Sequence, residues 1–266
     1  MGGAVDDKQR LRRTFRRFSI SRRRIRDDKG QLWADLDKDL VHHIRTVLRI
    51  GTGAKIILFD NTGKEYLAEI TSSTPSHVQT RILEQSEPKT ESGLEIVLAQ
   101  ALLKEQAFDH VLTAATELGV SKIIPITSNR VVAKIDAREA DKKLFRWKKI
   151  LEESASQSGR VKLPEISYPV GLDQLLKENF SGPKIILWEK ARGGELAAPA
   201  ITATVNAGAK MLLLIGPEGG FEDEEADRAI AAGFLPLGLG PRVLRAQTAP
   251  IAALAILQYL FGDLAK

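Results

Sequence analysis

The chain has 266 residues, of which 43% are hydrophobic and 27% are charged, and its formal net charge is +5. This length and apolar content allow one large domain or two ordinary ones and exclude a chain that is disordered throughout. Because the sequence contains no cysteine, disulfide bonds, thiolate catalysis and cysteine metal sites are also excluded.

A strongly basic segment lies near the N-terminus. Residues 8–26 read "KQRLRRTFRRFSISRRRIR" and contain ten Lys or Arg and no acidic residue, so the rest of the chain is net acidic. This distribution of charge is typical of an arm that contacts phosphates. A solvated tail and an Arg-rich transit peptide are the alternatives. Because Phe15, Phe18, Ile20 and Ile25 would suit one face of a strand, we favour contact with nucleic acid over a plain tail.

The next segments predict a small, mostly β unit. Residues 37–50, "DKDLVHHIRTVLRI", have apolar residues at helical spacing and predict a helix that ends at Gly51. Two strands joined by an Asn-Thr-Gly turn are predicted by "AKIILFDNTGKEYLAEITS", and a third strand by "HVQTRILEQ". Residues 86–93, "SEPKTESG", are polar, contain Pro and Gly, and predict a linker.

Beyond the linker, strand patterns alternate with helix patterns. Strands are predicted at residues 94–102, 121–127, 184–189, 211–216 and 234–240. Helices are predicted at residues 107–119, 144–159 and 222–233, and in the second of these Leu144, Trp147, Leu151 and Ala155 form an apolar stripe. This alternation predicts an α/β fold with a mostly parallel sheet that is covered on both faces.

Two glycine-bearing loops follow predicted strands, "LLIGPEGGF" at 213–221 and "LGLGPRVLR" at 237–245. Ligands of open α/β sheets bind beyond the carboxyl ends of the strands, where glycine lets the backbone approach closely. Neither loop matches the GxxxxGK[ST] or GxGxxG patterns of nucleotide-binding proteins. On the residues alone, an ordinary turn and a ligand-binding loop explain the first loop equally well.

The C-terminal segment "TAPIAALAILQYL", residues 248–260, predicts a helix with Thr248 as N-cap and Pro250 in its first turn. Its apolar residues lie on nearly every side, so more than one face must be covered. Gln258 interrupts the apolar run well short of the roughly 20 residues that a membrane helix needs. We therefore expect a soluble, cytoplasmic protein, with organelle import as the alternative that the Arg-rich N-terminus leaves open.

Several segments, in the same order over nearly the whole chain, resemble the family of 16S ribosomal RNA (uridine-N3)-methyltransferases, ribosomal RNA small subunit methyltransferase E, of the SPOUT superfamily. They are "HHIRTVLRIG", "LAQALLK", "ATELGVSKIIPI", "RWKKILEESASQSGR", "LLLIGPEGGF", "LGLGPRVLRAQTA" and "AALAILQ". The resemblance implies a basic extension at 1–13, a PUA-like β-barrel RNA-binding domain at 14–85, the linker at 86–93, and a SPOUT α/β methyltransferase domain at 94–266 whose C-terminal part forms a trefoil knot.

The resemblance also implies an activity and a cofactor. The protein would use S-adenosylmethionine to methylate N3 of a specific uridine in 16S ribosomal RNA, within the small ribosomal subunit, as a homodimer and without a metal. A monomer that buries the C-terminal helix in its own core is the alternative to the dimer. The implied cofactor-binding residues are Leu187, Trp188, Glu189, Ile215, Gly216, Pro217, Glu218, Gly219, Gly220, Leu237, Gly238, Leu239, Gly240, Leu244, Arg245 and Thr248. For Trp188, packing in the core is favoured over stacking on the cofactor.

The candidates for catalysis are Arg242, Arg245 and Glu218. A guanidinium of either arginine would stabilise the negative charge that develops on the uridine oxygens, with a salt bridge or a phosphate contact as the alternative. Glu218 is a candidate base for the N3 proton, although fixing the glycine loop or binding the ribose is favoured. The candidate RNA-binding residues are Arg12, Arg13, Arg16, Arg17, Arg22, Arg23, Arg24, Arg49 and Arg160. For Arg160, an ordinary surface arginine is the alternative.

The sequence departs from the family pattern at two positions. It has Gln247 where the family usually has Glu, and Ala114 where the family usually has Lys. Glutamine keeps the hydrogen-bonding capacity but loses the charge, so this position cannot supply a general base here. Two other functions therefore stay open: a SPOUT methyltransferase that acts on another RNA base or a ribose 2′-hydroxyl, and a non-catalytic RNA-binding ribosome assembly factor.

Overall fold

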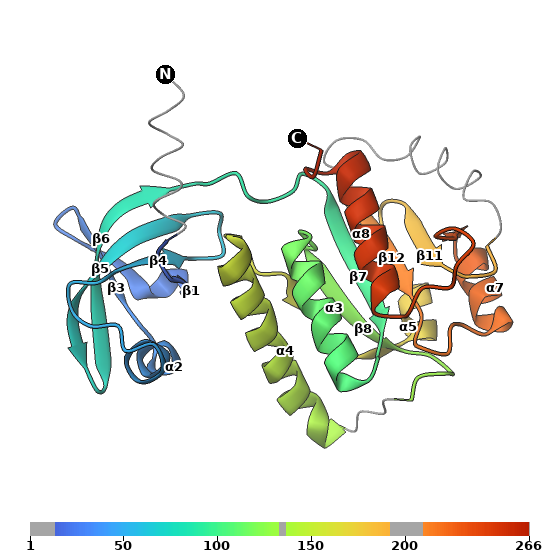
Figure 1. The fold of residues 1–266 in the computed structure, drawn as a ribbon, viewed down its shortest axis with the longest axis horizontal. Helices are drawn as coiled ribbons and strands as arrows, with labels where there is room; N and C mark the ends of the chain where they lie inside the picture. Colours follow the sequence, from blue (N-terminus) through green and yellow to red (C-terminus); the bar gives the residue numbers. More distant parts are fainter. Residues whose placement is uncertain (1–13, 133–136, 192–209, 266) are drawn as a thin grey trace. The chain divides into compact units, whose positions relative to one another are not determined.

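The computed structural model describes residues 14–132, 137–191 and 210–265 (Figure 1). The chain divides into two compact units, one formed by residues up to Glu91 together with Ala155–Leu163, and the other by Ser92–Ser154 and Pro164 onward. The break after Glu91 falls within the polar stretch 86–93. The return of residues 155–163 to the first unit has no counterpart in the sequence pattern. In the described ranges, no helix is both long and apolar enough to cross a membrane.

The first unit is built on a six-stranded mixed sheet with the order β1-β4-β5-β6-β3-β2. Its strands are β1 (Arg17–Ser19), β2 (Ile25–Asp28), β3 (Gln31–Asp35), β4 (Lys55–Phe59), β5 (Glu65–Thr74) and β6 (His77–Ser86). Strands β1 and β4 pair in parallel, and the other pairs are antiparallel. A core of alternate strand residues, including Ile56, Leu58, Ala68 and Ile70, lies on one face of the sheet.

Two predictions for the first unit are wrong in detail. The residues from Phe15 to Ile25 do not share one strand, because the short 3₁₀ helix η1 (Arg22–Arg24) separates β1 from β2. The helix predicted at 37–50 is a short α2 (Lys38–His42), capped by the Asp37 side chain, followed by one wide π turn, η2 (His43–Val47). Because the wide turn still buries Ile44 completely, the apolar spacing fits both geometries.

The second unit is built on a parallel seven-stranded sheet, which confirms the predicted α/β fold. Its order is β10-β8-β7-β12-β11-β13, with β9 paired to β8, and the described pairs are all parallel. The strands are β7 (Glu95–Ala101), β8 (Lys122–Thr127), β9 (Glu165–Ile166), β10 (Val170–Gly171), β11 (Lys184–Leu187), β12 (Lys210–Ile215) and β13 (Phe234–Leu237).

Helices cover both faces of this sheet (Figure 1). One face packs against α3 (Glu105–Glu117), α4 (Ala137–Ser158) and α8 (Thr248–Phe261), and the other against α5 (Leu172–Lys177) and α7 (Asp223–Ala231). Alternation along β7 serves both layers, since Ile96 points to the first core and Val97 to the second. In α4 the predicted stripe is buried, and Trp147 packs against Phe108 with ring centroids 5.0 Å apart.

The start of α8 differs from the prediction by one residue. Thr248 is the first helical residue and Gln247 takes the N-cap position without a side-chain cap hydrogen bond. The backbone N–H groups of Thr248 and Ala249 donate instead to the carbonyl of Arg245, at 2.8 and 2.9 Å. The loop that follows β13 thus runs directly into the helix and closes its first turn.

Candidate functional site

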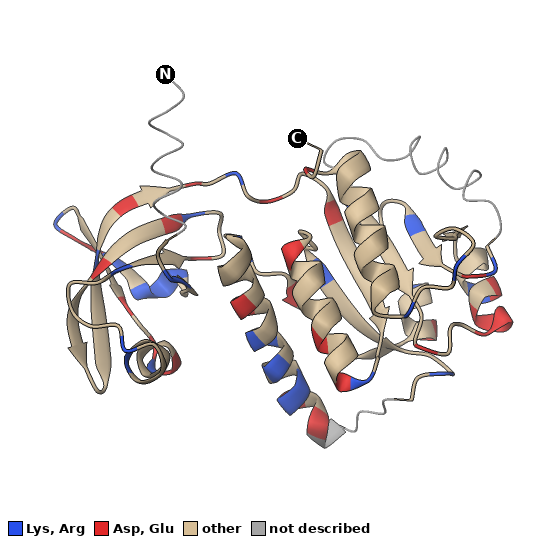
Figure 2. Ribbon diagram, viewed as in Figure 1, with Lys and Arg blue, Asp and Glu red and all other residues tan. Residues whose placement is uncertain are grey.

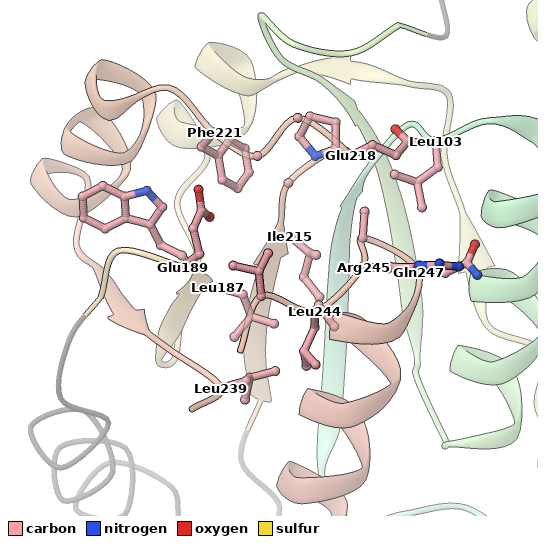
Figure 3. Close-up of a pocket in the computed structure, with 18 of the residues that line it drawn as sticks. Leu103, Leu187, Glu189, Ile215, Glu218, Phe221, Leu239, Leu244, Arg245 and Gln247 are labelled. Carbon is pink, nitrogen blue, oxygen red and sulfur yellow. The ribbon is translucent and has the colours of Figure 1, made fainter. Parts of the chain in front are cut away.

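A cavity of about 670 Å³ opens beyond the carboxyl ends of β11, β12 and β13 (Figure 3). Three connections line it: residues 187–189 after β11, 215–221 after β12, and 237–247 between β13 and α8, without Gly238. Leu103, Lys104 and Ala107 add a fourth side from the start of α3. Figure 3 shows Leu187, Ile215, Leu239 and Leu244 in the middle of the view, so the floor of the cavity is apolar.

The glycine loop after β12, residues 216–221, is a tight turn that packs on the buried side chain of Phe221. The N–H of Gly220 donates to the carbonyl of Pro217 at 3.0 Å, and Gly220 has a φ of +69°. The side chain of Phe221 is buried under the loop, and a Cβ at Gly216 would lie 3.1 Å from its ring. A side chain at Gly216 would therefore displace the phenylalanine that anchors the turn.

The next residues fix the exit of this loop. Glu222 caps α7, and its capping box is completed by the buried Glu225, whose carboxylate accepts the backbone N–H of Glu222 at 3.0 Å. The other oxygen of Glu225 accepts the N–H of Asn129 at 2.8 Å, and the Asn129 amide donates to Glu222 at 2.7 Å. The connection after β8 is therefore tied to the start of α7.

Arg130 joins the same network from the β8 connection. Its guanidinium donates to the carbonyl of Gly219 at 3.0 Å, and a Cβ at Gly219 would lie 3.2 Å from the Cβ of Arg130. Sequence reasoning missed Asn129 and Arg130. The only available signal was their position directly after a strand, since the carboxyl ends of neighbouring parallel strands meet at one edge.

Glu218 connects the glycine loop to α3. Its carboxylate accepts the backbone N–H of Lys104, the N-cap residue of α3, at 3.0 Å. A carboxylate at a helix N-terminus is stabilised by the unpaired N–H groups and the helix dipole. The fully buried Gln100 supports the loop from β7, because its amide donates to the carbonyls of Ala101 at 3.1 Å and Gly216 at 3.4 Å.

The predicted cofactor-binding residues converge on this cavity, with two exceptions. All line it apart from Gly238 and Thr248. A Cβ at Gly238 would lie only 2.5 Å from the carbonyl oxygen of Ala191, so glycine is required there for the β11 and β13 connections to pack. Thr248 is exposed in the first turn of α8. Trp188 packs against the second core, the role that was favoured, and it also lines the cavity.

Charged side chains surround the apolar floor. Arg242, Arg245, Lys104, Glu189 and Glu218 line the cavity, and all of these residues are exposed. Gln247 also lines it, beside Arg245 at the start of α8 (Figure 3). In the described residues the indole N–H of Trp188 is buried and has no hydrogen-bond partner. The site thus combines an apolar floor, two glycine-bearing loops and a charged rim, which suits a planar polar ligand.

The expected RNA-binding arginines fall into two groups. Arg16, Arg23, Arg24 and Arg49 are exposed, and Arg22 is half-exposed and donates to the buried hydroxyl of Tyr66. Burial and the Asp60 carboxylate raise the pKa of Tyr66, which keeps it a neutral donor to Asp60. Arg12 and Arg13 lie outside the described residues.

Arg17 and Arg160 do not face solvent, so the expectation that they contact RNA does not hold in this structure. Arg17 donates to Glu65 at 2.6 Å and to the carbonyls of Gly159 and Arg160. Arg160 is 5% exposed and donates to Glu91 at 2.8 and 3.1 Å. Because buried charges are costly unless they are paired, these arginines hold the end of α4 within the first unit. In the parts that the structure describes, no cluster of three His, Cys, Asp or Glu could hold a metal ion.

Family models match both units. The model described as RNA methyltransferase domain matches residues 90–258, and the model described as RNA methyltransferase PUA domain matches residues 36–83. Two curated relatives are named ribosomal RNA small subunit methyltransferase E. The one from Bacillus subtilis is 33% identical over 82% of this chain and 87% of its own length. The one from Synechocystis is 34% identical over 81% of this chain and 69% of its own length.

Solved structures agree with these matches. A putative methyltransferase from Legionella pneumophila, in complex with bound S-adenosylmethionine, is 36% identical and superposes with a TM-score of 0.85 over 94% of this chain and 99% of that chain. A ribosomal RNA small subunit methyltransferase E from Neisseria gonorrhoeae, also bound to S-adenosylmethionine, is 31% identical with a TM-score of 0.82 and the same coverage of both chains.

Proposed function

Because the chain belongs to the family of ribosomal RNA small subunit methyltransferase E, we propose that it transfers the methyl group of S-adenosylmethionine to N3 of a uridine in small-subunit ribosomal RNA. The observation that carries this proposal is the glycine-loop cavity beyond β11, β12 and β13. Two solved structures that resemble this chain in fold contain bound S-adenosylmethionine. Action on ribosomal RNA is consistent with a location in the cytoplasm, which we propose for this protein.

The residues of the cavity fit S-adenosylmethionine. The volume of about 670 Å³ lies in the range of small-molecule sites. Leu187, Ile215 and Leu239 would provide an apolar surface for the adenine, and the loops at 215–221 and 237–247 bring backbone to the wall of the cavity. The exposed carboxylate of Glu189 would supply an acceptor at the same wall.

S-adenosylmethionine supplies an electrophilic methyl group when it is bound. The chain's own residues would then hold the uridine in line and stabilise the charge that appears on its carbonyl oxygens as the N3 proton passes to solvent water. Arg245 and Arg242 stand at the rim with exposed guanidinium groups and suit this role. The neutral amide of Gln247, in the same wall, can orient the base by hydrogen bonds but cannot accept its proton.

We also propose the trefoil knot and the homodimer. The return of the chain after β13, across the cavity and into α8, supports the knot. An exposed apolar groove on α8 supports the dimer: Ile256, Tyr259 and Leu260 are 48%, 62% and 59% exposed, and Leu264 continues the same groove. A second copy of the chain would cover these contiguous apolar side chains and remove them from water.

Nucleoside analysis tests the proposed reaction. The purified protein would be incubated with S-adenosylmethionine carrying a labelled methyl group and with small ribosomal subunits, free small-subunit RNA or large-subunit RNA. We expect label only in small-subunit RNA, and digestion followed by mass spectrometry should identify it as 3-methyluridine. A labelled 2′-O-methyl nucleoside or another methylated base would show that the enzyme modifies a site other than N3 of uridine. Cofactor binding without any transfer would favour the assembly factor.

Replacement of Glu218 tests whether it positions the glycine loop. Glu218→Ala removes the acceptor of the Lys104 N–H, and we expect cofactor affinity to fall about five- to tenfold. Glu218→Gln keeps an acceptor and should lower it by less than about threefold. Equilibrium dialysis with labelled cofactor measures both. If Glu218→Gln instead abolishes methyl transfer while the cofactor still binds, Glu218 acts as the base.

Deletion of residues 1–13 tests the basic arm. A deletion up to residue 26 would also remove β1 and the buried Phe18 and Ile20, and would damage the first unit. The shorter deletion removes Lys8, Arg10, Arg12 and Arg13. We expect RNA affinity to fall about tenfold at low salt with a flatter salt dependence, because each lost phosphate contact lowers the slope of log K against log salt by about 0.7 to 0.9. Unchanged RNA binding in fluorescence anisotropy would rule the arm out.

A further inference from the structure

The first half of α4 carries a basic surface that the proposed site does not use. It consists of Lys142, Phe145, Lys148 and Lys149, here called the α4 lysine face. Figure 2 shows basic positions gathered on this stretch of the helix. Phe145 is 56% exposed, whereas Leu144, Trp147 and Leu151 of the apolar stripe are buried.

Helical geometry separates this face from the core. Lys142, Phe145 and Lys149 follow each other at spacings of three and four residues and therefore lie on one side of the helix, opposite the buried stripe. The ammonium of Lys149 lies over the ring of Phe145, 4.5 Å from its centroid. Phe145 therefore lies on the solvent side of the helix and not at the edge of the core. Lys142 precedes it and Lys149 follows it on the same side.

The lysines of this face are free to bind a partner. Among the described residues, Lys142, Lys148 and Lys149 form no ion pair, although Arg146 on the same helix is paired with Glu105 and Asp109 of α3. Acidic residues also border the face: Asp141 accepts the hydroxyl of Tyr168, and Glu152 and Glu153 follow Lys149 by three and four residues. Tyr168 is 50% exposed, so a second accessible aromatic side chain adjoins the first turn of the face.

We propose that the α4 lysine face binds the RNA substrate, with phosphates at the lysines and an unpaired base stacked on the face of the Phe145 ring that Lys149 does not cover. This inference rests on the proposed function, because it assigns a surface for the same substrate. Lys142 and Lys149 are two helical turns apart, about 10 Å along the axis, which suits phosphates on both sides of one nucleotide. Exposed aromatic rings between basic side chains are the usual platform for single-stranded RNA, whereas an acidic protein partner would not require the ring.

Anisotropy titrations with small-subunit RNA over a series of salt concentrations test the face in the full chain. Lys142→Gln and Lys149→Gln should each lower the slope of log K against log salt by about 0.7 to 0.9, and the double variant by about twice as much. Phe145→Ala should weaken binding about fivefold or more at every salt concentration and leave the slope unchanged. Because all three residues are exposed, little loss of stability is expected, and circular dichroism checks the fold.

Lys177→Gln is the matched control. It removes the same charge from an exposed position on α5, on the opposite face of the sheet, and should bind RNA as the wild type does. If the face variants bind RNA like Lys177→Gln while the wild type binds and methylates RNA, the face proposal is wrong and the proposed function stands. If the wild type neither binds nor methylates RNA, both fail. Cofactor affinity should be unchanged in every variant.

Discussion

Replacing Gly220 by valine is expected to weaken the binding of S-adenosylmethionine by at least about 30-fold. Gly220 has a φ of +69°, in the left-handed region that β-branched residues avoid. A Cβ there would lie 3.0 Å from the carboxylate of Glu189, which lines the same cavity. The backbone would have to leave its turn, or the side chains would enter the space of the cofactor. Either change costs about 2 kcal/mol or more, which corresponds to this loss of affinity.

Gly53→Val is the control that distinguishes the effect of backbone strain from the effect of disturbing the cofactor site. Gly53 has a similar φ of +86° and lies in the first unit, and a Cβ at this position would have no neighbouring atom within 4 Å. The variant should therefore carry the same backbone strain and bind the cofactor normally. Equilibrium dialysis with labelled cofactor gives both affinities. Equal and near-normal affinities for the two variants would show that the glycine loop does not hold the cofactor.

Arg245→Ala is expected to lower the rate of methyl transfer by about 10²- to 10³-fold, the usual loss when one group that stabilises a developing oxyanion is removed. Arg245 lines the cavity with an exposed guanidinium, and its backbone carbonyl accepts the N–H groups of Thr248 and Ala249 in α8. The substitution should therefore leave α8 intact and change cofactor affinity by less than about threefold. Single-turnover assays with saturating RNA separate this effect on the chemical step from weaker binding.

Arg245→Lys provides a conservative comparison. Lysine keeps the charge but lacks the planar pair of donors that can bind a uracil oxygen from a fixed direction, so it should recover only part of the rate. Arg242→Ala in the same assay tells which of the two arginines serves the base. A wild-type rate for Arg245→Ala, with a fall in RNA affinity alone, would make Arg245 a phosphate contact.

The sheet of the second unit followed from the sequence because its strands are buried on both faces. Short apolar runs such as "MLLLIG" and "KIILWE" are typical of central strands of a parallel sheet, and the apolar stripe of α4 fixes which side of that helix is buried. The two-residue strands β9 and β10 carry no such signal, since they are too short to show a period.

The charged residues were harder to predict because their partners are distant in the sequence. Arg17 and the carbonyl of Gly159 are 142 residues apart, and no local pattern distinguishes this buried arginine from the exposed ones around it. Arg160 could not be predicted as buried for the same reason, because its partner Glu91 is also distant in the sequence. Most of the cavity lining followed from the resemblance to the family, and the glycine loops alone left an ordinary turn open. Arg130 resembles any polar residue after a strand until the fold brings it to Gly219.

Calorimetric titration of S-adenosylmethionine into the wild-type protein tests the central claim most directly. A cofactor site formed by the connections after β11, β12 and β13 predicts a saturable signal with one site per chain, which the demethylated product S-adenosylhomocysteine should suppress by competition. A folded protein, checked by circular dichroism, that gives no heat beyond dilution would contradict it. The chain would then bind RNA as an assembly factor without the methyl transfer proposed for it.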